Sequence, residues 1–212
     1  MTPERKARFA EILDKRQASL TIILEDIIDQ HNISAVLRSC DSVGIGEVYI
    51  ITSDKLKYCK IRPETPLQSW KGRKISASAN KWIHIHLFQS IEECMAAVRA
   101  KYDLIYSTHL SDDAKDLYEL DLTQSVALLF GNERDGLSDE ALSHADGNFC
   151  IPQVGMIKSL NISVACAVTL YEAYRQRNKA EMYDTMSLDA AEKQATLEAW
   201  VQRDFDAKRK GR

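Results

Sequence analysis

The sequence predicts an α/β protein built on a mostly parallel sheet, and two observations predict it. Short apolar runs rich in β-branched residues alternate along the chain with longer segments whose apolar residues recur at helical spacing. The chain has 212 residues, 45% hydrophobic and 28% charged, which is enough for one good core with appendages. Because repeated strand-then-helix units connect parallel strands, we expect helices to cover both faces of the sheet.

The elements are expected in a regular order. Thr2 as a cap and Pro3 at the first helical position begin a short amphipathic basic helix that runs to about Gln17. The apolar run over 20–24 predicts the first strand, and the helical spacing over 32–43 predicts the helix that follows it. Further strands are expected at 48–51, 82–88, 104–106 and 126–130, and further helices at 90–101, 160–177 and 188–207.

Several classes of protein are disfavoured by what the sequence lacks. No run approaches the roughly 18 apolar residues of a membrane span, and the amino end has no apolar signal segment, so we expect no membrane association. Five cysteines without a Cys-x-x-Cys pair or a regular spacing predict a reduced, cytoplasmic protein. His84 and His86 share one face of a strand, but the sequence offers no third ligand nearby, so we expect no metal.

The charge is unevenly distributed, although the formal net charge is only -3. Residues 55–81 carry eight Lys or Arg against one acid, whereas residues 82–147 carry four against thirteen acids. A basic segment that also contains Ser, Gly and aromatic residues is typical of a loop that contacts nucleic-acid phosphates. We therefore expect Lys71, Arg73 and Lys74 to bind RNA, and a solvated lysine-rich loop is the alternative.

Polar clusters fall where predicted strands end and helices begin. Asn32 and Asn161 each come at a helix start, where Asn accepts hydrogen bonds from unpaired backbone N–H groups. A helical side chain leans toward its helix N-terminus, so Arg38 is expected to bring its guanidinium near Asn32. Gly131-Asn132-Glu133 follows the strand VALLF, at the end of the sheet where open α/β folds bind ligands. Half of the eight glycines fall within 131–155, which suits a backbone pressed against a ligand.

At these clusters the sequence resembles the SpoU, or TrmH, branch of the SPOUT methyltransferases. The family's first motif, Asn-x5-Arg, is matched by HNISAVLRSCDSVG, the second, Gly-x-Glu-x-x-Gly, by GNERDGLS, and the third by IPQVGMIKSLNISVA. The three motifs occur in the family's order over roughly residues 20–175. Within the family, the opening basic helix, the segment STHLSDDA and the ending LYEAYRQR are most similar to the tRNA guanosine-18 2′-O-methyltransferases.

The resemblance implies a deep trefoil knot, in which the carboxyl part of the domain is threaded through a loop, and a homodimer packed through the knot region. General rules of chain topology would have argued against a knot. Three parts are implied: an N-terminal basic helix over 1–19, a SPOUT methyltransferase domain over 20–178 and a C-terminal helical extension over 179–212, whose tail matches no family pattern. The residues of the last core helix that are expected in the dimer interface are Val164, Ala165, Val168 and Leu170.

The resemblance also implies S-adenosylmethionine as cofactor, bent into the knot loops, and tRNA as partner. The residues that match cofactor-contacting positions are Thr108, Gly131, Ile151, Met156 and Leu160. Those that match the catalytic cluster are Asn32, Arg38, Glu133, Ser159 and Asn161. Those that match positions on the RNA-facing surface are Arg8, Arg16, Arg175 and Arg177.

The reaction implied is methyl transfer to a ribose 2′-hydroxyl, that of guanosine 18 in the D-loop of tRNA. An arginine has a pKa above ~12, so Arg38 is a poor general base. We expect Arg38 to hold an RNA phosphate and stabilise the developing alkoxide, while that phosphate or a water accepts the proton. Glu133 and Asn161 would orient Arg38 and the loops, Asn32 would fix the nucleotide or Arg38, and Ser159 would lie near the ribose.

Alternatives remain open. Glu133 could serve only to stabilise its loop. The same chemistry could act on another RNA, such as a wobble-position ribose or ribosomal RNA, or the chain could be a non-catalytic RNA-binding module. The complete motif set favours the enzyme, because binding alone would not need Asn32, Arg38, Glu133 and Asn161 together.

Overall fold

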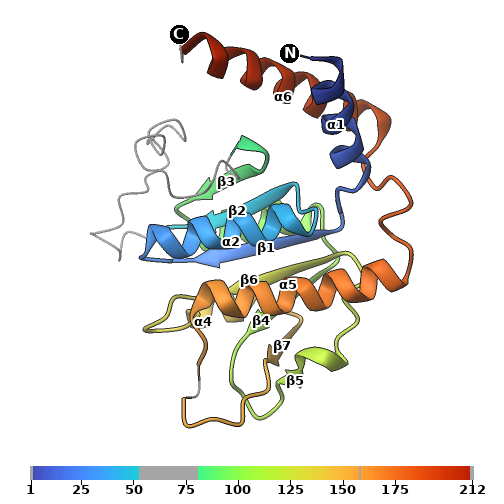
Figure 1. The fold of residues 1–212 in the computed structure, drawn as a ribbon. Helices are drawn as coiled ribbons and strands as arrows, with labels where there is room; N and C mark the ends of the chain where they lie inside the picture. The colour runs from blue at the N-terminus through green and yellow to red at the C-terminus, as the bar shows by residue number, and fades with distance from the viewer. Residues whose placement is uncertain (1, 53–80, 158, 211–212) are drawn as a thin grey trace.

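Figure 1 shows the fold in a computed structural model, which describes residues 2–52, 81–157 and 159–210. Within them one sheet has the strand order β3-β2-β1-β6-β4-β7-β5, and every neighbouring pair is parallel. The predicted mostly parallel α/β fold is confirmed. The strands are β1 (Leu20–Glu25), β2 (Glu47–Ile51), β3 (His84–Phe88), β4 (Leu104–Thr108), β5 (Lys115–Asp116), β6 (Val126–Phe130) and β7 (Gly147–Cys150).

Helices cover both faces of the sheet. They are α1 (Pro3–Asp14), α2 (Gln30–Ser42), α3 (Ile91–Arg99), the short 3-10 helix η3 (Leu117–Glu119), α4 (Asp139–Leu142), α5 (Ile162–Lys179) and α6 (Ala190–Lys210). Helices α2 and α5 lie side by side on one face, and α3 and α4 contribute to the core on the other (Figure 1). Helices α1 and α6 pack on each other beyond one end of the sheet.

Successive side chains of the central strands point alternately to the two faces of the sheet. In β1, Leu20, Ile22 and Leu24 point into the core beneath α2 and α5, whereas Ile23 points into the core beneath α3. Strand β6 pairs with β1 from Leu20↔Val126 to Leu24↔Phe130 and alternates in the same way. Because both faces are covered, β6 is wholly apolar and β1 is apolar except for Thr21 and Glu25, which is why their apolar runs predicted strands correctly.

Parallel pairing gives the sheet two chemically different edges. All strands end at one edge, here called the carboxyl edge, where the loops after β1, β4, β6 and β7 begin. They start at the opposite edge, here called the amino edge, where α1 and α6 lie (Figure 1). The three sequence motifs follow β1, β6 and β7, so the fold brings all three to the carboxyl edge.

The two terminal helices are held together by a small aromatic cluster. The ring of Trp200 on α6 lies 5.6 Å from that of Phe9 on α1 and 5.1 Å from that of Trp82. Arg5 pairs with the buried Asp204 at 2.7 Å. The strand predicted over 82–88 begins at His84, and the ring of Trp82 belongs to this terminal cluster.

The remaining boundaries differ by a few residues. Helix α2 begins at Gln30 because Asp29 is its cap, two residues earlier than Asn32. Helix α5 begins at Ile162 and not at Leu160, since Asn161 caps it. The short strand β5 was not predicted, because two residues are too few for an alternating pattern. Among the described helices, none is long and apolar enough to span a membrane.

Candidate active site

A chain of side-chain hydrogen bonds joins the three motifs at the carboxyl edge. Nδ2 of Asn32 donates to Oε1 of Glu133, and Nδ2 of Asn161 donates to Oδ1 of Asn32 over 3.2 Å. Asn32 lies in the first turn of α2, Glu133 in the turn after β6, and Asn161 at the start of α5. Asn32 is therefore the centre of the cluster, since its amide uses both its donor and its acceptor to bridge the other two motifs.

Helix capping explains why the two asparagines behave differently. Asp29 caps α2 and accepts from the backbone N–H of His31 at 2.8 Å, so the predicted capping role of Asn32 is wrong. Asn161 does cap α5, as expected, because its Oδ1 accepts from the backbone N–H and the hydroxyl of Ser163 at 2.9 and 2.6 Å. Because Asp29 caps α2, the side chain of Asn32 is free to contact Glu133 and Asn161.

The turn that carries Glu133 closes tightly on itself. Oδ1 of Asn132 accepts from the backbone N–H groups of Arg134 and Asp135 at 2.9 and 2.8 Å. The backbone of Asn132 also pairs with that of Gly136, whose φ of 70° is in the left-handed region that favours glycine. A Cβ on Gly131 would lie 2.2 Å from the carbonyl carbon of Gly136, so only glycine fits there.

Sequence reasoning missed a second anchor of this turn. Glu25, the last residue of β1, is buried, and it accepts hydrogen bonds from the hydroxyl and the backbone N–H of Ser138 at 2.5 and 3.0 Å. Ser138 is the cap of α4. Glu25 could have been recognised from the sequence as an acidic residue at the end of an apolar strand. A charged side chain is buried at such a position only when it has partners.

Arg38 and Ser159 lie outside the hydrogen-bonded chain. Arg38 is exposed, and its side chain makes no hydrogen bond or ion pair with another described residue. It lies six residues beyond Asn32, roughly 9 Å further along the helix axis. We expected its guanidinium to lie near Asn32, but the structure shows no contact between the two side chains. Ser159 is exposed in the loop before α5.

The positions matched to cofactor contacts lie at the end of β4 and in the segments that follow β6 and β7. Thr108 is half-buried, and its hydroxyl donates to the carbonyl of Leu129 at 3.3 Å. Gly131 is buried and Ile151 is half-buried. Met156 is 98% exposed, so its side chain is not covered by the rest of the described chain, whereas Leu160 is 37% exposed and is partly covered.

Four arginines were expected on an RNA-facing surface, and the structure corrects two of them. Arg8 is exposed and pairs with Glu11 at 3.2 Å, and Arg175 is exposed and pairs with Glu172 at 2.7 Å. Arg16 and Arg177 are buried, with 2% and 0% of their surface exposed. Lys71, Arg73 and Lys74 lie outside the described residues.

The guanidinium of Arg177 makes all of its hydrogen bonds inside the protein. Its five N–H donors reach the carbonyls of Leu122, Ser19 and Gln124, the hydroxyl of Ser19 and Oε1 of Gln17, at 2.6 to 3.2 Å. Burial lowers its pKa to about 10. The guanidinium thus fastens the end of α5 to the amino edge of the sheet, which is why it cannot face RNA.

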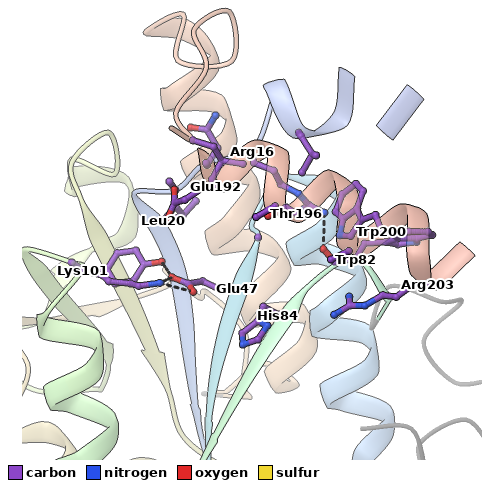
Figure 2. Close-up of a pocket in the computed structure, with 18 residues that line it drawn as sticks. Arg16, Leu20, Glu47, Trp82, His84, Lys101, Glu192, Thr196, Trp200 and Arg203 are labelled. Atoms are coloured by element: carbon purple, nitrogen blue, oxygen red, sulfur yellow. Dashed lines mark hydrogen bonds and ion pairs between the residues drawn. The ribbon is translucent and has the colours of Figure 1, made fainter. Parts of the chain in front are cut away.

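Arg16 borders a cavity of about 560 Å³ at the amino edge, between α6 and the first residues of β1, β2 and β3 (Figure 2). It donates to the carbonyls of Ile45 and Trp82 at 2.6 and 3.1 Å and pairs with Asp41 at 2.9 Å. Its guanidinium also lies 5.2 Å from the ring of Trp200. The cavity is at the edge opposite to the three motifs and is not part of the candidate site.

Glu47, at the start of β2, is the acceptor in a network beside this cavity (Figure 2). It accepts from His86 at 2.9 Å, Lys101 at 3.0 Å and Tyr102 at 2.8 Å. Burial by itself would raise the pKa of Glu47, but these hydrogen bonds and the charge of Lys101 outweigh burial and lower it to about 2. His86 is thus engaged by a carboxylate, and the described residues contain no cluster of three metal-ligating side chains.

A parallel sheet whose carboxyl edge joins an Asn, a Glu and a second Asn from three ordered motifs defines a SpoU-type methyltransferase domain. The model of the SpoU rRNA Methylase family matches residues 19–171, and the chain belongs to this family.

Individual relatives extend the match to the terminal helices. The chain is 38% identical over 202 residues to the tRNA (guanosine(18)-2'-O)-methyltransferase of Thermus thermophilus, covering 95% of this chain and 98% of that protein. It is 37% identical over 205 residues to the enzyme of the same name from Escherichia coli, covering 93% and 82%. The crystal structure of the Aquifex aeolicus TrmH/SpoU tRNA modifying enzyme has a TM-score of 0.81 at 33% identity and covers 95% of this chain and 96% of that one.

Proposed function

We propose that this chain transfers a methyl group from S-adenosylmethionine to the 2′-hydroxyl of guanosine 18 in tRNA, and that it works in the cytoplasm. The observation that carries the proposal is the length of the match. Relatives named for this reaction align with 95% and 93% of the chain, well beyond the residues 19–171 that the family model matches. The hydrogen-bonded chain of Asn32, Glu133 and Asn161 supports a working site, since it assembles the three motifs in one place.

The residues at the carboxyl edge fit the proposed cofactor. The loops after β4, β6 and β7 begin side by side there, at Thr108, Gly131 and Ile151. The turn at Gly131 brings two stretches of backbone together and leaves no room for a Cβ. Polar backbone next to apolar side chains suits a ligand that combines a purine, a ribose and a charged amino acid. When bound, this cofactor supplies an electrophilic methyl group.

Asn32, Arg38 and Ser159 have different roles in the proposed reaction. Asn32 holds Glu133 and Asn161, so it fixes the motif-two turn against the start of α5. Arg38 is on the same helix as Asn32 and is exposed, so its guanidinium is available to an RNA phosphate. There it would stabilise charge that develops on the 2′-oxygen, while the phosphate or a water accepts the proton. Ser159, exposed before the α5 cap, would approach the ribose.

We further propose a homodimer and a knotted carboxyl part, as the family resemblance implies. Val154, Met156, Ile157 and Val164 are exposed apolar residues in the loop before α5 and in its first turn. Such a patch suits an interface. Leu170, which was expected in the interface, is fully buried in the core of one chain, so that part of the expectation is wrong. The position of β4 between β6 and β7 supports threading in this region.

The test is methylation of defined RNAs by the purified protein. Transcripts of one tRNA, unchanged or carrying a 2′-deoxy nucleotide at position 18, and a ribosomal RNA are incubated with the protein and S-adenosylmethionine, and ribose methylation is mapped. We expect methylation at guanosine 18 of the unchanged transcript alone. Methylation at the wobble ribose or in ribosomal RNA in its place would overturn the proposed substrate, and no transfer to any of these RNAs would favour the binding module.

A further inference from the structure

We propose that Glu25, which lies outside the three motifs, is a positioning residue for methyl transfer because it holds the motif-two turn in place. The inference rests on the proposed function. Glu25 is the last residue of β1 and is only 3% exposed. Its Oε1 accepts from the hydroxyl of Ser138 at 2.5 Å and its Oε2 accepts from the backbone N–H of Ser138 at 3.0 Å.

The turn between β6 and α4 is thereby tied to the β1–α2 segment at two points. Asn32 binds Glu133 near the middle of the turn, and Glu25 binds Ser138 where the turn becomes α4. The register of β1 and β6 ends at the pair Leu24↔Phe130, so Glu25 lies at the end of β1 beside the place where the turn leaves β6. Gly131 begins the turn, and any displacement of the turn moves its backbone.

A carboxylate at position 25 satisfies both donors of Ser138 at once. The hydroxyl of Ser138 accepts from the backbone N–H of Ala141 at 3.1 Å, as the cap of α4, while it donates to Glu25. Two donors of Ser138 therefore point at one side chain, and a carboxylate offers two acceptor oxygens. A glutamine has the same shape but would turn an NH2 group toward one of these donors. The substitution Glu25→Gln isolates this difference.

A matched control lies at the other edge of the same sheet. Glu47 is also a largely buried strand carboxylate that accepts several hydrogen bonds, but it faces the amino edge. If Glu25 only stabilised the fold, Glu25→Gln and Glu47→Gln would have the same kind of effect. A positioning role predicts that Glu25→Gln alone changes cofactor binding.

The experiment compares the wild type with Glu25→Gln, Ser138→Ala and Glu47→Gln. Calorimetry gives the affinity for S-adenosylmethionine without RNA, steady-state assays give KM for the cofactor and kcat, and hydrogen exchange reports the amides of 131–138. We expect Glu25→Gln and Ser138→Ala to weaken cofactor binding about tenfold or more and to speed exchange in the turn, because small displacements in a site are costly. Glu47→Gln should change neither. The double variant Glu25→Gln with Ser138→Ala should be little worse than either single one, since both remove one interaction.

The outcomes separate the two proposals. Wild-type cofactor affinity and exchange in a folded Glu25→Gln protein would overturn the role of Glu25. Equal losses in Glu47→Gln would do the same. If Glu25→Gln fails to fold, Ser138→Ala, which removes only a hydroxyl, decides the question with the same readouts. If the wild type methylates no tRNA, the proposed function fails, and exchange in the 131–138 turn still tests whether Glu25 holds it.

Discussion

Nδ2 of Asn161 donates a hydrogen bond to Oδ1 of Asn32 over 3.2 Å, which connects the cap of α5 to the first turn of α2 across 129 positions of the chain. Because Asn32 also binds Glu133, one amide fixes the relative position of three motifs. The geometry makes Asn32 the structural centre of the cluster, and Arg38 on the same helix is exposed.

Replacing Arg38 with Ala should abolish methylation and leave cofactor affinity nearly unchanged, because Arg38 has no described partner that its loss would disturb. Rate is measured with saturating tRNA and cofactor affinity by calorimetry. Retention of more than about a tenth of the wild-type rate, some 1.4 kcal/mol in barrier, would contradict the assigned role. Arg38→Lys tests whether charge alone is sufficient.

Replacing Gly131 with Ala should disrupt the motif-two turn, since the added Cβ would lie 2.2 and 2.3 Å from backbone atoms of Gly136. We expect cofactor binding to fall at least tenfold, a loss of about 1.4 kcal/mol. Gly46→Ala is the control at the amino edge, because among the described residues a Cβ there would meet only Cδ of Arg16 at 3.9 Å, an ordinary van der Waals contact. Equal affinities for the two variants would refute the argument.

Arg177 should matter for stability and not directly for RNA. Arg177→Met would leave buried carbonyls of Ser19, Leu122 and Gln124 without a donor, and we expect the free energy of unfolding to fall by at least about 2 kcal/mol. Arg175→Ala, at an exposed and solvent-screened pair, should leave the free energy of unfolding close to that of the wild type. Urea unfolding measures both.

The dependence of tRNA binding on salt concentration tests which of these basic residues contact RNA. A folded Arg177→Met protein should keep the wild-type slope of log affinity against log salt. Reversing Lys71, Arg73 and Lys74 to Glu should flatten that slope, by about 0.9 per lost phosphate contact if duplex behaviour carries over. An unchanged slope after the triple reversal would identify residues 55–81 as solvated surface.

Glu47 should contribute to the acid stability of the protein. Its pKa of about 2 in the fold lies below the ordinary value of 4.5, so its carboxylate stabilises the fold above pH 4.5 and the effect is lost as pH falls toward 2. Unfolding free energies of wild type and Glu47→Gln should therefore differ most near neutral pH, by on the order of 3 kcal/mol, and converge in acid. A difference that is independent of pH would show that the charge is not responsible.

The exposed apolar start of α5 should be a subunit interface. Val164 is 47% exposed in the single chain, and Val164→Glu should convert a dimer to a monomer because it would bury a charge in an apolar contact. Ala180→Glu, exposed at the other end of α5, is the control. Sedimentation at micromolar concentration decides, and a monomeric wild type would contradict the interface.

Much of this architecture could be predicted from local sequence. The strands β1 and β6 are mainly apolar because both faces are buried, and Asn161 is recognisable as a cap because capping acts within three residues. The three motifs could be placed at one edge, since parallel strands all end on the same side. The termini of the helices were less certain, as the shift of α2 to Asp29 shows.

Burial of charged residues could not be read from the sequence, because it depends on which distant carbonyls and carboxylates the fold brings together. The sequence by itself determined the parallel α/β order, the motif spacing and the family. Only the tertiary structure decided that Arg16 and Arg177 are internal, that Asn32 bridges and does not cap, and that Glu25 meets Ser138 across 113 positions. A guanidinium or carboxylate is stable inside a protein only when many donors and acceptors from separate segments surround it, and those segments become neighbours only when the chain folds.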